Sequence, residues 1–242
     1  MWTFVSPKIV FGENALMHLG QIKGKKAFIV TDKMMVSLGY VKLIQDNLEK
    51  AGIGSMVFDE VEPEPSFETV MKGKEILAKN DCDIIIGLGG GSPMDAAKAI
   101  RIIYEMPEVR VEDIAPMMEI SVGKIKLILI PTTSGTGSEV TTAIVLTDKA
   151  GGRKAPTVHP DVGADLAIVD PSLIMELPKS LIADTGMDAL SHSIDAYISD
   201  WKNEYSDGLA IKALNMIFKY LPRSYKDPTD KEAKEKMHVA AS

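Results

Sequence analysis

IIIGLGGGSPMDAAKAI, at residues 84–100, is the stretch that decides the predicted fold of this chain. Its first residues are β-branched, as is typical of a buried parallel strand, and its last residues are rich in alanine, which favours a helix. A cluster of glycines joins the two, so we expect a strand, a tight turn and a helix in that order. We expect the helix to begin at the glycines, with Ser92 as its N-cap, Pro93 at its first position and Asp95 near the positive end of its dipole.

The glycine turn itself is predicted to bind an anion. Residues without Cβ, here Gly89, Gly90 and Gly91, let a ligand approach the main chain, and the free N–H groups of the first helical turn point toward it. A phosphate group suits this arrangement, whereas the alternative is an ordinary turn that uses glycine for its geometry. The spacing differs from the usual dinucleotide fingerprint, because Ser92 stands at the third glycine position.

Composition places the chain among soluble globular proteins. It has 242 residues, of which 45% are hydrophobic and 25% charged, and we expect two domains. No apolar run is long enough to span a bilayer, and a net charge of -7 argues against nucleic acid or an anionic membrane as a partner. The single cysteine, Cys82, is expected to pack as a free thiol. The first residues lack a basic segment followed by an apolar stretch, so we expect a cytoplasmic protein.

Strands and helices alternate over the first 178 residues, which predicts an α/β fold with a doubly wound, Rossmann-like parallel sheet. After Pro178 the pattern is helical only. We therefore expect an α/β dinucleotide-binding domain at residues 1–178 and the start of an all-helical domain at residues 179–242. Besides the strand at residue 84, the expected elements are a short edge strand before Gly12, strands at 27–32, 56–58, 126–130, 143–146 and 166–170, helices at 14–19, 37–51 and 67–79, and a solvated helix with its preceding loop at 226–236.

Asp32 ends the second expected strand. A carboxylate at the carboxyl end of a strand commonly binds the adenine-ribose hydroxyls in doubly wound sheets, where it would repel an extra phosphate. This residue therefore predicts NAD rather than NADP as the cofactor. A simple helix-capping role is the alternative.

A second loop, PTTSGTGSE at residues 131–139, follows its strand directly and carries five hydroxyl side chains and two glycines. Such a loop can offer hydroxyl and main-chain donors to a diphosphate or a ribose, and it is expected at the same edge of the sheet as the glycine turn. A plain connector rich in turn formers is the alternative. Further along, Lys154 could reach a cofactor, although an exposed lysine is usually only solvated, and His159 is expected to serve loop structure.

Asp188 and His192 stand four residues apart on one predicted helix and therefore share a face. Both side chains could bind one metal ion. Two protein ligands are too few for a well-held transition metal, which needs three or four. By spacing alone, a helical salt link or a core histidine is the favoured explanation of the pair.

Three motifs together, GGGSPxD at 89–95, PTTxGTGSE at 131–139 and GMDALxH at 186–192, resemble the iron-containing (group III) alcohol dehydrogenases, and the resemblance extends over the whole chain. It implies a dehydroquinate synthase-like architecture, an NAD site, and a metal site for Fe2+, with Zn2+ as the other candidate. It assigns Asp188 and His192 as metal ligands. The cofactor contacts that it supports are Asp32, Gly89, Gly90, Gly91, Ser92, Asp95, Thr132, Thr133, Thr136, Ser138 and Lys154.

Two departures from the family pattern limit this resemblance. Many relatives carry, in place of Glu64, an asparagine that touches the cofactor. The family completes its metal site with two later histidines that lie beyond Ser242, and His238 matches a position upstream of them, so we do not expect it to be a ligand. We therefore expect the 242-residue chain to bind NAD measurably, to hold metal substoichiometrically and to oxidise alcohols negligibly.

The implied reaction is metal-assisted hydride transfer between NAD and a small alcohol, which yields an aldehyde or a ketone. No general base is evident in the sequence, and a homo-oligomer, most simply a dimer, is expected. The alternatives are a polyol dehydrogenase, a sugar-phosphate cyclase, or a non-catalytic nucleotide-binding or oligomerising fragment. Metal analysis beside an NAD titration separates the fragment from the enzyme, and a substrate panel separates the enzymes.

Overall fold

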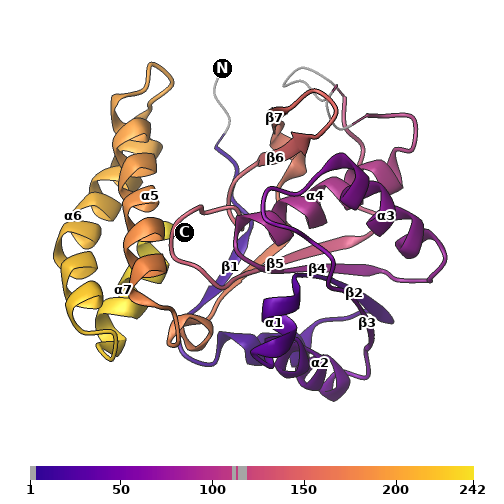
Figure 1. The fold of residues 1–242 in the computed structure, drawn as a ribbon, viewed down its shortest axis with the longest axis horizontal. Coiled ribbons are helices and arrows are strands. Elements are labelled where there is room, and N and C mark those ends of the chain that lie inside the picture. The colour runs from indigo at the N-terminus through magenta and orange to yellow at the C-terminus, as the bar shows by residue number, and fades with distance from the viewer. Residues whose placement is uncertain (1–3, 111–112, 114–118) are drawn as a thin grey trace.

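The computed structural model describes residues 4–110, 113 and 119–242. At its centre is a six-stranded sheet in which every pair is parallel, as the sequence predicts (Figure 1). In spatial order the strands are β1 (Lys8–Phe11), β8 (Leu166–Val169), β5 (Lys126–Pro131), β4 (Ile84–Gly89), β2 (Lys26–Val30) and β3 (Gly54–Phe58).

Helices cover both faces of this sheet because the strands bury both faces. Along β4, Ile85 packs on one side, while Ile84 and Ile86 pack on the other, and all three are fully buried. The first side carries α3 (Phe67–Ala78) and α4 (Gly91–Glu105), and the second carries the 3-10 helix η1 (Ala15–Gln21), α1 (Lys33–Ser37) and α2 (Tyr40–Lys50). The doubly wound α/β prediction is therefore confirmed.

Two of the expected helices differ from the structure in detail. The helix expected at 37–51 is α2, which begins at Tyr40 because Gly39, with a left-handed φ of 78°, stands directly before it; the short helix α1, which the sequence analysis did not predict, precedes Gly39. The segment after Asn14 is the 3-10 helix η1. Both differences lie on the side of the sheet away from α3 and α4.

The strand expected at 143–146 does not join the parallel sheet. It is β6 (Ala143–Asp148), which pairs antiparallel with β7 (Arg153–Val158), a segment where the sequence analysis predicts no strand. The hairpin packs over α4, since the Asp95 carboxylate accepts a hydrogen bond from the main-chain N–H of Val145. The hairpin places Lys154 above the carboxyl edge of the sheet, where ligands bind in such folds.

The helices after Pro178 are α5 (Lys179–Ile198), α6 (Glu204–Lys226) and α7 (Lys231–Ala241), and they lie together at one side of the sheet (Figure 1). Their shared core is Ala189, Ile217, Tyr220, Ala233 and Met237. The prediction of a solvated helix at 226–236 is wrong for the inner face of α7. Lys234 there is only 2% exposed, because its ammonium donates to the main-chain carbonyl oxygens of Ile174 and Met175.

None of the helices in the described part of the chain combines the length and the apolar character needed to cross a membrane.

Candidate cofactor-binding site

The strand order creates a crevice between the carboxyl ends of β2 and β4. From β2 the chain moves outward to β3 and then returns to the other side of β2 as β4, so the direction of winding reverses between these two strands. Ligands of open α/β sheets bind at this reversal. Asp32 follows β2 and the glycine turn (residues 89–92) follows β4, and both therefore lie at the predicted place.

The glycine turn has a geometry that other residues would not allow. Gly89 has a φ of 145°, and a Cβ on it would lie 2.7 Å from Cγ of Pro93. Helix α4 begins at Gly91 with Gly90 as its N-cap, so the prediction that Ser92 caps the helix and that Pro93 is its first residue is wrong by two positions. The reason is that the sharp turn at Gly89 lets the helix begin earlier, and the Ser92 hydroxyl instead accepts a hydrogen bond from the N–H of Glu64 (3.2 Å).

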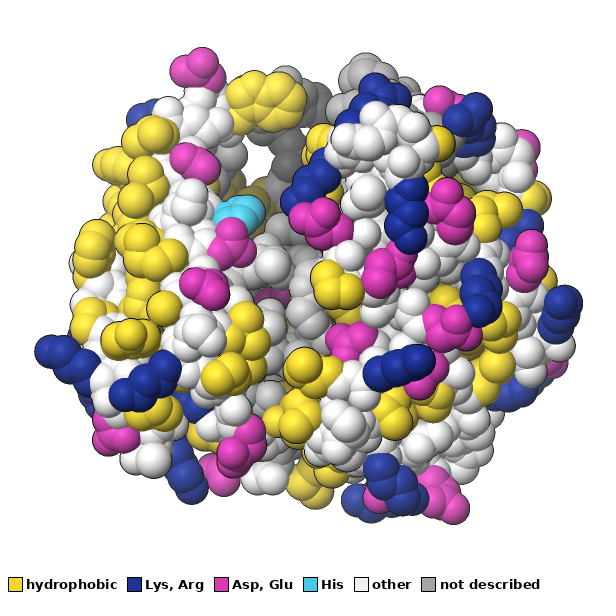
Figure 2. Space-filling model, in the orientation of Figure 1, with side chains coloured by type: hydrophobic (Ala, Val, Ile, Leu, Met, Phe, Trp, Pro, Cys, Tyr) yellow, Lys and Arg dark blue, Asp and Glu magenta, His cyan; other side chains and the backbone are white. Residues whose placement is uncertain are grey.

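Two cavities meet at this turn and form one groove. The first, of about 380 Å³, reaches from Asp32 to the glycine turn. The second, of about 410 Å³, reaches from the glycine turn to Asp188 and His192 on α5. Gly91 and Ser92 line both cavities. Figure 2 shows that the molecule is hollowed between the α/β part and the helices at its left.

Asp32 lines one end of the groove and also caps α1. Its Oδ1 accepts hydrogen bonds from the N–H groups of Met34 (2.8 Å) and Met35 (3.0 Å). The capping alternative is therefore present in the structure. It does not exclude the ribose role, because a cap uses one carboxylate oxygen and Asp32 also lines the cavity.

The threonine loop (residues 131–139) runs beside the glycine turn. The N–H of Thr132 donates to the carbonyl oxygen of Gly89 (2.9 Å), and the Thr133 side chain lies against Gly90. Thr136 lines the groove, whereas Thr132 and Thr133 are not among its lining residues. Ser138 also lines the groove, but its hydroxyl already donates to the Asp95 carboxylate (2.6 Å).

Asp188 and His192 lie at the far end of the groove. Asp188 Oδ1 and His192 Nε2 are 3.3 Å apart, and both side chains are substantially exposed. A carboxylate and an imidazole suit Fe2+ or Zn2+, but within residues 4–110, 113 and 119–242 no group of three His, Cys, Asp or Glu side chains is placed to hold a metal ion. The two residues alone do not fit a held metal ion.

Comparison with known proteins identifies the family. Residues 6–171 match the model of the iron-containing alcohol dehydrogenases, and residues 182–242 match the C-terminal model of the Fe-containing alcohol dehydrogenase family. The chain belongs to the iron-containing alcohol dehydrogenase family. The resemblance of the three sequence motifs is thereby confirmed.

Three relatives of this chain illustrate the match. It is 43% identical over 257 residues to the aldehyde-alcohol dehydrogenase 2 of Entamoeba histolytica, with 100% of the chain and 29% of the relative covered. It is 42% identical over 244 residues to the NADPH-dependent butanol dehydrogenase of Clostridium saccharobutylicum, with 99% and 62% covered. The sulfoacetaldehyde reductase of Bifidobacterium kashiwanohense, solved in complex with NAD+, superposes with a TM-score of 0.91 at 34% identity, with 100% and 65% covered. The chain thus spans less than two thirds of each relative.

Lys98 is a site residue that the sequence analysis missed. Its side chain is fully buried beneath the groove, and its ammonium donates to Ser138 Oγ (2.9 Å) and to the carbonyl oxygen of Ala143 (2.8 Å). Asp95 Oδ1 lies 3.6 Å away. Burial lowers the pKa of Lys98 and raises that of Asp95. The available signal was the spacing, since residues three apart share a helix face.

Lys154 is not free in the groove. It comes from β7 and forms an ion pair with Glu64 Oε1 at 2.7 Å, and both side chains line the cavity that holds Asp188 and His192. Glu64 has a φ of 57°, and its loop is ordered by Glu62. Burial opposes ionisation of Glu62, but hydrogen bonds from Thr69 and Ser66 outweigh it and hold the pKa of Glu62 at about 2.

We expect Glu64→Gln to tighten NAD binding about fivefold at low salt. The substitution removes a negative charge from the groove and releases the Lys154 ammonium, and a charge at this range is worth about 1 kcal/mol in water. The exposed ion pair itself contributes little to stability, so the melting temperature should stay nearly constant. The dissociation constant, measured by calorimetry at 20 mM and 500 mM salt, checks this, because screening should remove most of the gain.

Asp46→Asn is the matched control, since Asp46 forms a similarly exposed ion pair with Lys42 on α2 but does not line the groove. This control should leave NAD affinity unchanged. Equal NAD affinity for Glu64→Gln and the unmodified chain at low salt would show that the ion pair does not oppose the cofactor.

Cys82 and His159 have the packing and loop roles that the sequence predicts. Cys82 is a buried free thiol. His159 caps the short 3-10 helix that follows it, as its Nδ1 accepts a hydrogen bond from the N–H of Asp161. His238 is 1% exposed on α7, with Nδ1 3.1 Å from Ser134 Oγ.

Proposed function

We propose that this chain supplies the cofactor-binding part of an NAD-dependent oxidoreductase that interconverts an alcohol and an aldehyde or ketone. The observation that carries the proposal is the groove, which begins at Asp32, passes the N-terminus of α4 and ends at Asp188 and His192. A bound dinucleotide needs the same three features in the same order: a partner for its ribose, a site for its diphosphate, and a place for its reactive end beside the substrate. Membership of the family supports the same activity.

In this proposal each part of the groove has a separate task. Asp32 accepts hydrogen bonds from the adenine-ribose hydroxyls. The N–H groups at Gly90, Gly91 and Ser92 bind the diphosphate, where the helix dipole favours negative charge. Thr136 and Lys154 hold the second half of the cofactor, which brings the nicotinamide toward the end of the groove at Asp188. The contacts proposed for Asp95, Thr132, Thr133 and Ser138 remain sequence predictions.

The metal site predicted at Asp188 and His192 is likewise a proposal. Asp188 and His192 contribute two ligands of suitable chemistry to a site for Fe2+ or Zn2+, and further ligands would have to come from outside the described residues. The expectation of substoichiometric metal in the 242-residue chain therefore remains a prediction.

We expect NAD to bind at least about tenfold more tightly than NADP. The 2′-phosphate would lie beside the Asp32 carboxylate, and repulsion between close charges costs about 1–2 kcal/mol near a protein surface. Titration of the unmodified chain with both nucleotides measures the ratio and also tests the proposed function. NADP binding as tightly as NAD would contradict the role of Asp32. The known relatives include both an NADPH-dependent enzyme and one solved with NAD+.

Asp32→Gly should relax this preference, and Asp32→Asn separates the two roles of the side chain. Asparagine keeps a cap for α1 but removes the charge. Both variants should lose the preference for NAD, and Asp32→Gly should lower the melting temperature only slightly more than Asp32→Asn, because glycine is itself an acceptable N-cap.

The substrate proposed for the whole protein is a small alcohol or aldehyde. A polyol dehydrogenase is the second candidate, and a substrate panel with NAD distinguishes the two.

We also propose a cytoplasmic homo-oligomer, most simply a dimer. The support for the oligomer is the exposed apolar side chains of α5 and α6, among them Ile198, Leu209 and Phe218. Figure 2 shows hydrophobic side chains gathered over these helices. The support for the compartment is the free thiol of Cys82.

A further inference from the structure

The back of the threonine loop is held by the helices that follow Pro178. Ser134 Oγ lies 3.1 Å from Nδ1 of His238 on α7, and both residues are buried. In the part of the chain that the structure describes, this is the one hydrogen bond of the Ser134 side chain. The contact joins residues 104 positions apart in the sequence.

Three further contacts join the threonine loop to the helical part of the chain. Ser242 Oγ donates to Glu139 Oε1 (2.6 Å). A Cβ on Gly135 would lie 2.7 Å from the carbonyl oxygen of Thr185 on α5, and a Cβ on Gly137 would lie 2.8 Å from that of Ala241 on α7. The loop and the helices therefore touch along their main chains, which leaves the loop little freedom to move alone.

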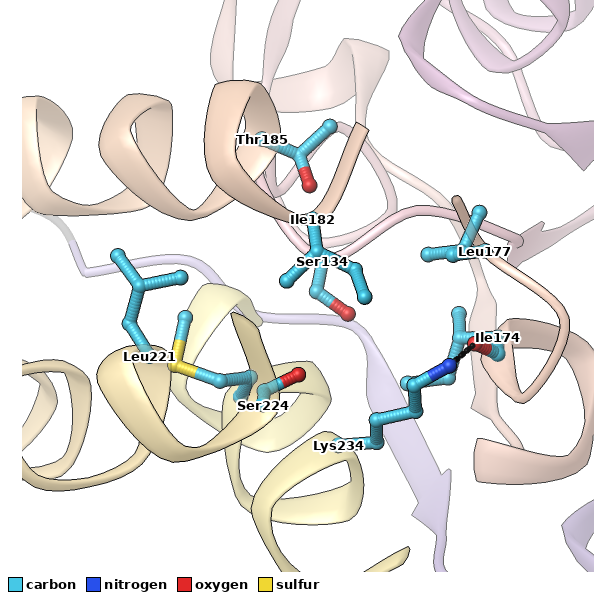
Figure 3. Close-up of a pocket in the computed structure, with 9 residues that line it drawn as sticks. Ser134, Ile174, Leu177, Ile182, Thr185, Leu221, Ser224 and Lys234 are labelled. Atoms are coloured by element: carbon cyan, nitrogen blue, oxygen red, sulfur yellow. Dashed lines mark hydrogen bonds between the residues drawn. The ribbon is translucent and has the colours of Figure 1, made fainter. Parts of the chain in front are cut away.

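The junction around Ser134 has almost no free space. Figure 3 shows Ser134 and Thr185 facing a small void, whose other lining residues include Ile174, Leu221 and Lys234. The void measures about 10 Å³. It holds one water molecule at most. A change at this junction therefore has to move the loop or the helices, because no cavity can absorb it.

The front of the loop faces the cofactor groove. Thr136 lines the groove two residues after Ser134, and Gly91, in the glycine turn, would place a Cβ only 3.2 Å from Cγ2 of Thr136. A shift of the loop by a fraction of an ångström would thus change the contact between the two halves of the cofactor site.

We propose that His238 is a positioning residue for the cofactor: through Ser134 it fixes the threonine loop in the conformation that binds NAD. The inference rests on the proposed function, because it requires that the groove bind NAD. It assigns a role to a residue that lies outside the groove and, by sequence, in the helical part of the chain.

The imidazole of His238 is suited to this role because it is neutral at pH 7. Burial holds the pKa of His238 at about 4, although the charge of Asp170 acts in the opposite direction. Its Nε2 has no hydrogen-bond partner among the described residues, so Nδ1 makes its polar contact. Asparagine places an amide group near the position of Nδ1, and glutamine places one near Nε2.

The test compares three substitutions at His238 with Ser134→Ala. We expect His238→Phe, His238→Gln and Ser134→Ala each to raise the NAD dissociation constant about tenfold, which corresponds to about 1.4 kcal/mol. His238→Asn should retain near-normal affinity. The double variant of His238→Phe and Ser134→Ala should be no weaker than either single variant, because both remove the same contact. Ser134→Ala carries the test if the phenylalanine variant does not fold.

Ile217→Val is the control for general loosening of the helices. Ile217 lies in the core shared by α5, α6 and α7, and this substitution typically costs about 0.5–1.5 kcal/mol of stability. It should lower the melting temperature without changing NAD affinity. Equal weakening by Ile217→Val, or unchanged affinity in His238→Phe, would overturn the inference. Failure of the unmodified chain to bind NAD would instead overturn the proposed function, and the inference with it.

Discussion

Lys98→Met should destabilise the protein by about 3–5 kcal/mol, which is the usual cost of removing one partner from a buried ion pair. The methionine side chain has nearly the volume of lysine, so packing changes little. What is lost is the ammonium group that Ser138, Ala143 and Asp95 all contact. The Asp95 carboxylate would then be a buried charge whose nearest positive partner has gone.

Urea unfolding followed by circular dichroism measures this cost. Lys72→Met is the matched control, since Lys72 is half exposed in its ion pair with Glu60 and should change stability by less than about 1 kcal/mol. Adding Asp95→Asn to Lys98→Met should recover part of the loss, because the unpaired charge is removed while Ser138 and Val145 keep an acceptor. A loss below about 1 kcal/mol for Lys98→Met would mean that the pair is not buried as the structure shows.

The local features of the cofactor site could be predicted from the sequence. The run of isoleucines before the glycines specifies a strand, a turn and a helix without any distant partner, and the structure has all three. Asp32 and the threonine loop follow strands, so their common edge follows from parallel pairing. The first residue of α4 could not be predicted, because it depends on the φ of Gly89.

The features that the sequence did not reveal all depend on distant partners. The run at 143–146 has the apolar character of a sheet strand, but its pairing with β7 decides where it lies. In the sequence, Lys98 cannot be distinguished from an exposed helical lysine, because its burial depends on the packing of β6 over α4. Lys234 and His238 stand in a charged segment, and their burial follows from packing against η4 (Pro171–Ile174) and the threonine loop.

Gly91→Val should weaken NAD binding on the order of 100-fold while the fold survives. Gly91 is the first residue of α4 and lies where the two cavities of the groove meet; a Cβ there would lie 3.2 Å from Cγ2 of Thr136, so that side chain has to shift by a few tenths of an ångström. The branched side chain would occupy the space next to the main-chain N–H groups that are proposed to bind the diphosphate. Two charge-assisted hydrogen bonds, each worth about 1.5–3 kcal/mol, would be lost or lengthened.

Gly208→Val is the matched control, because Gly208 lies on α6 with no atom within 4 Å of its would-be Cβ. Calorimetric titration with NAD and with adenosine completes the test. Adenosine lacks the diphosphate, so its affinity should change far less than that of NAD in the Gly91 variant. Equal losses for both ligands would mean that valine disturbs the whole groove, and unchanged NAD affinity would reduce the glycine turn to a structural element. A selective loss of NAD would instead place the diphosphate at the N-terminus of α4, where the main-chain N–H groups of the glycine turn lie.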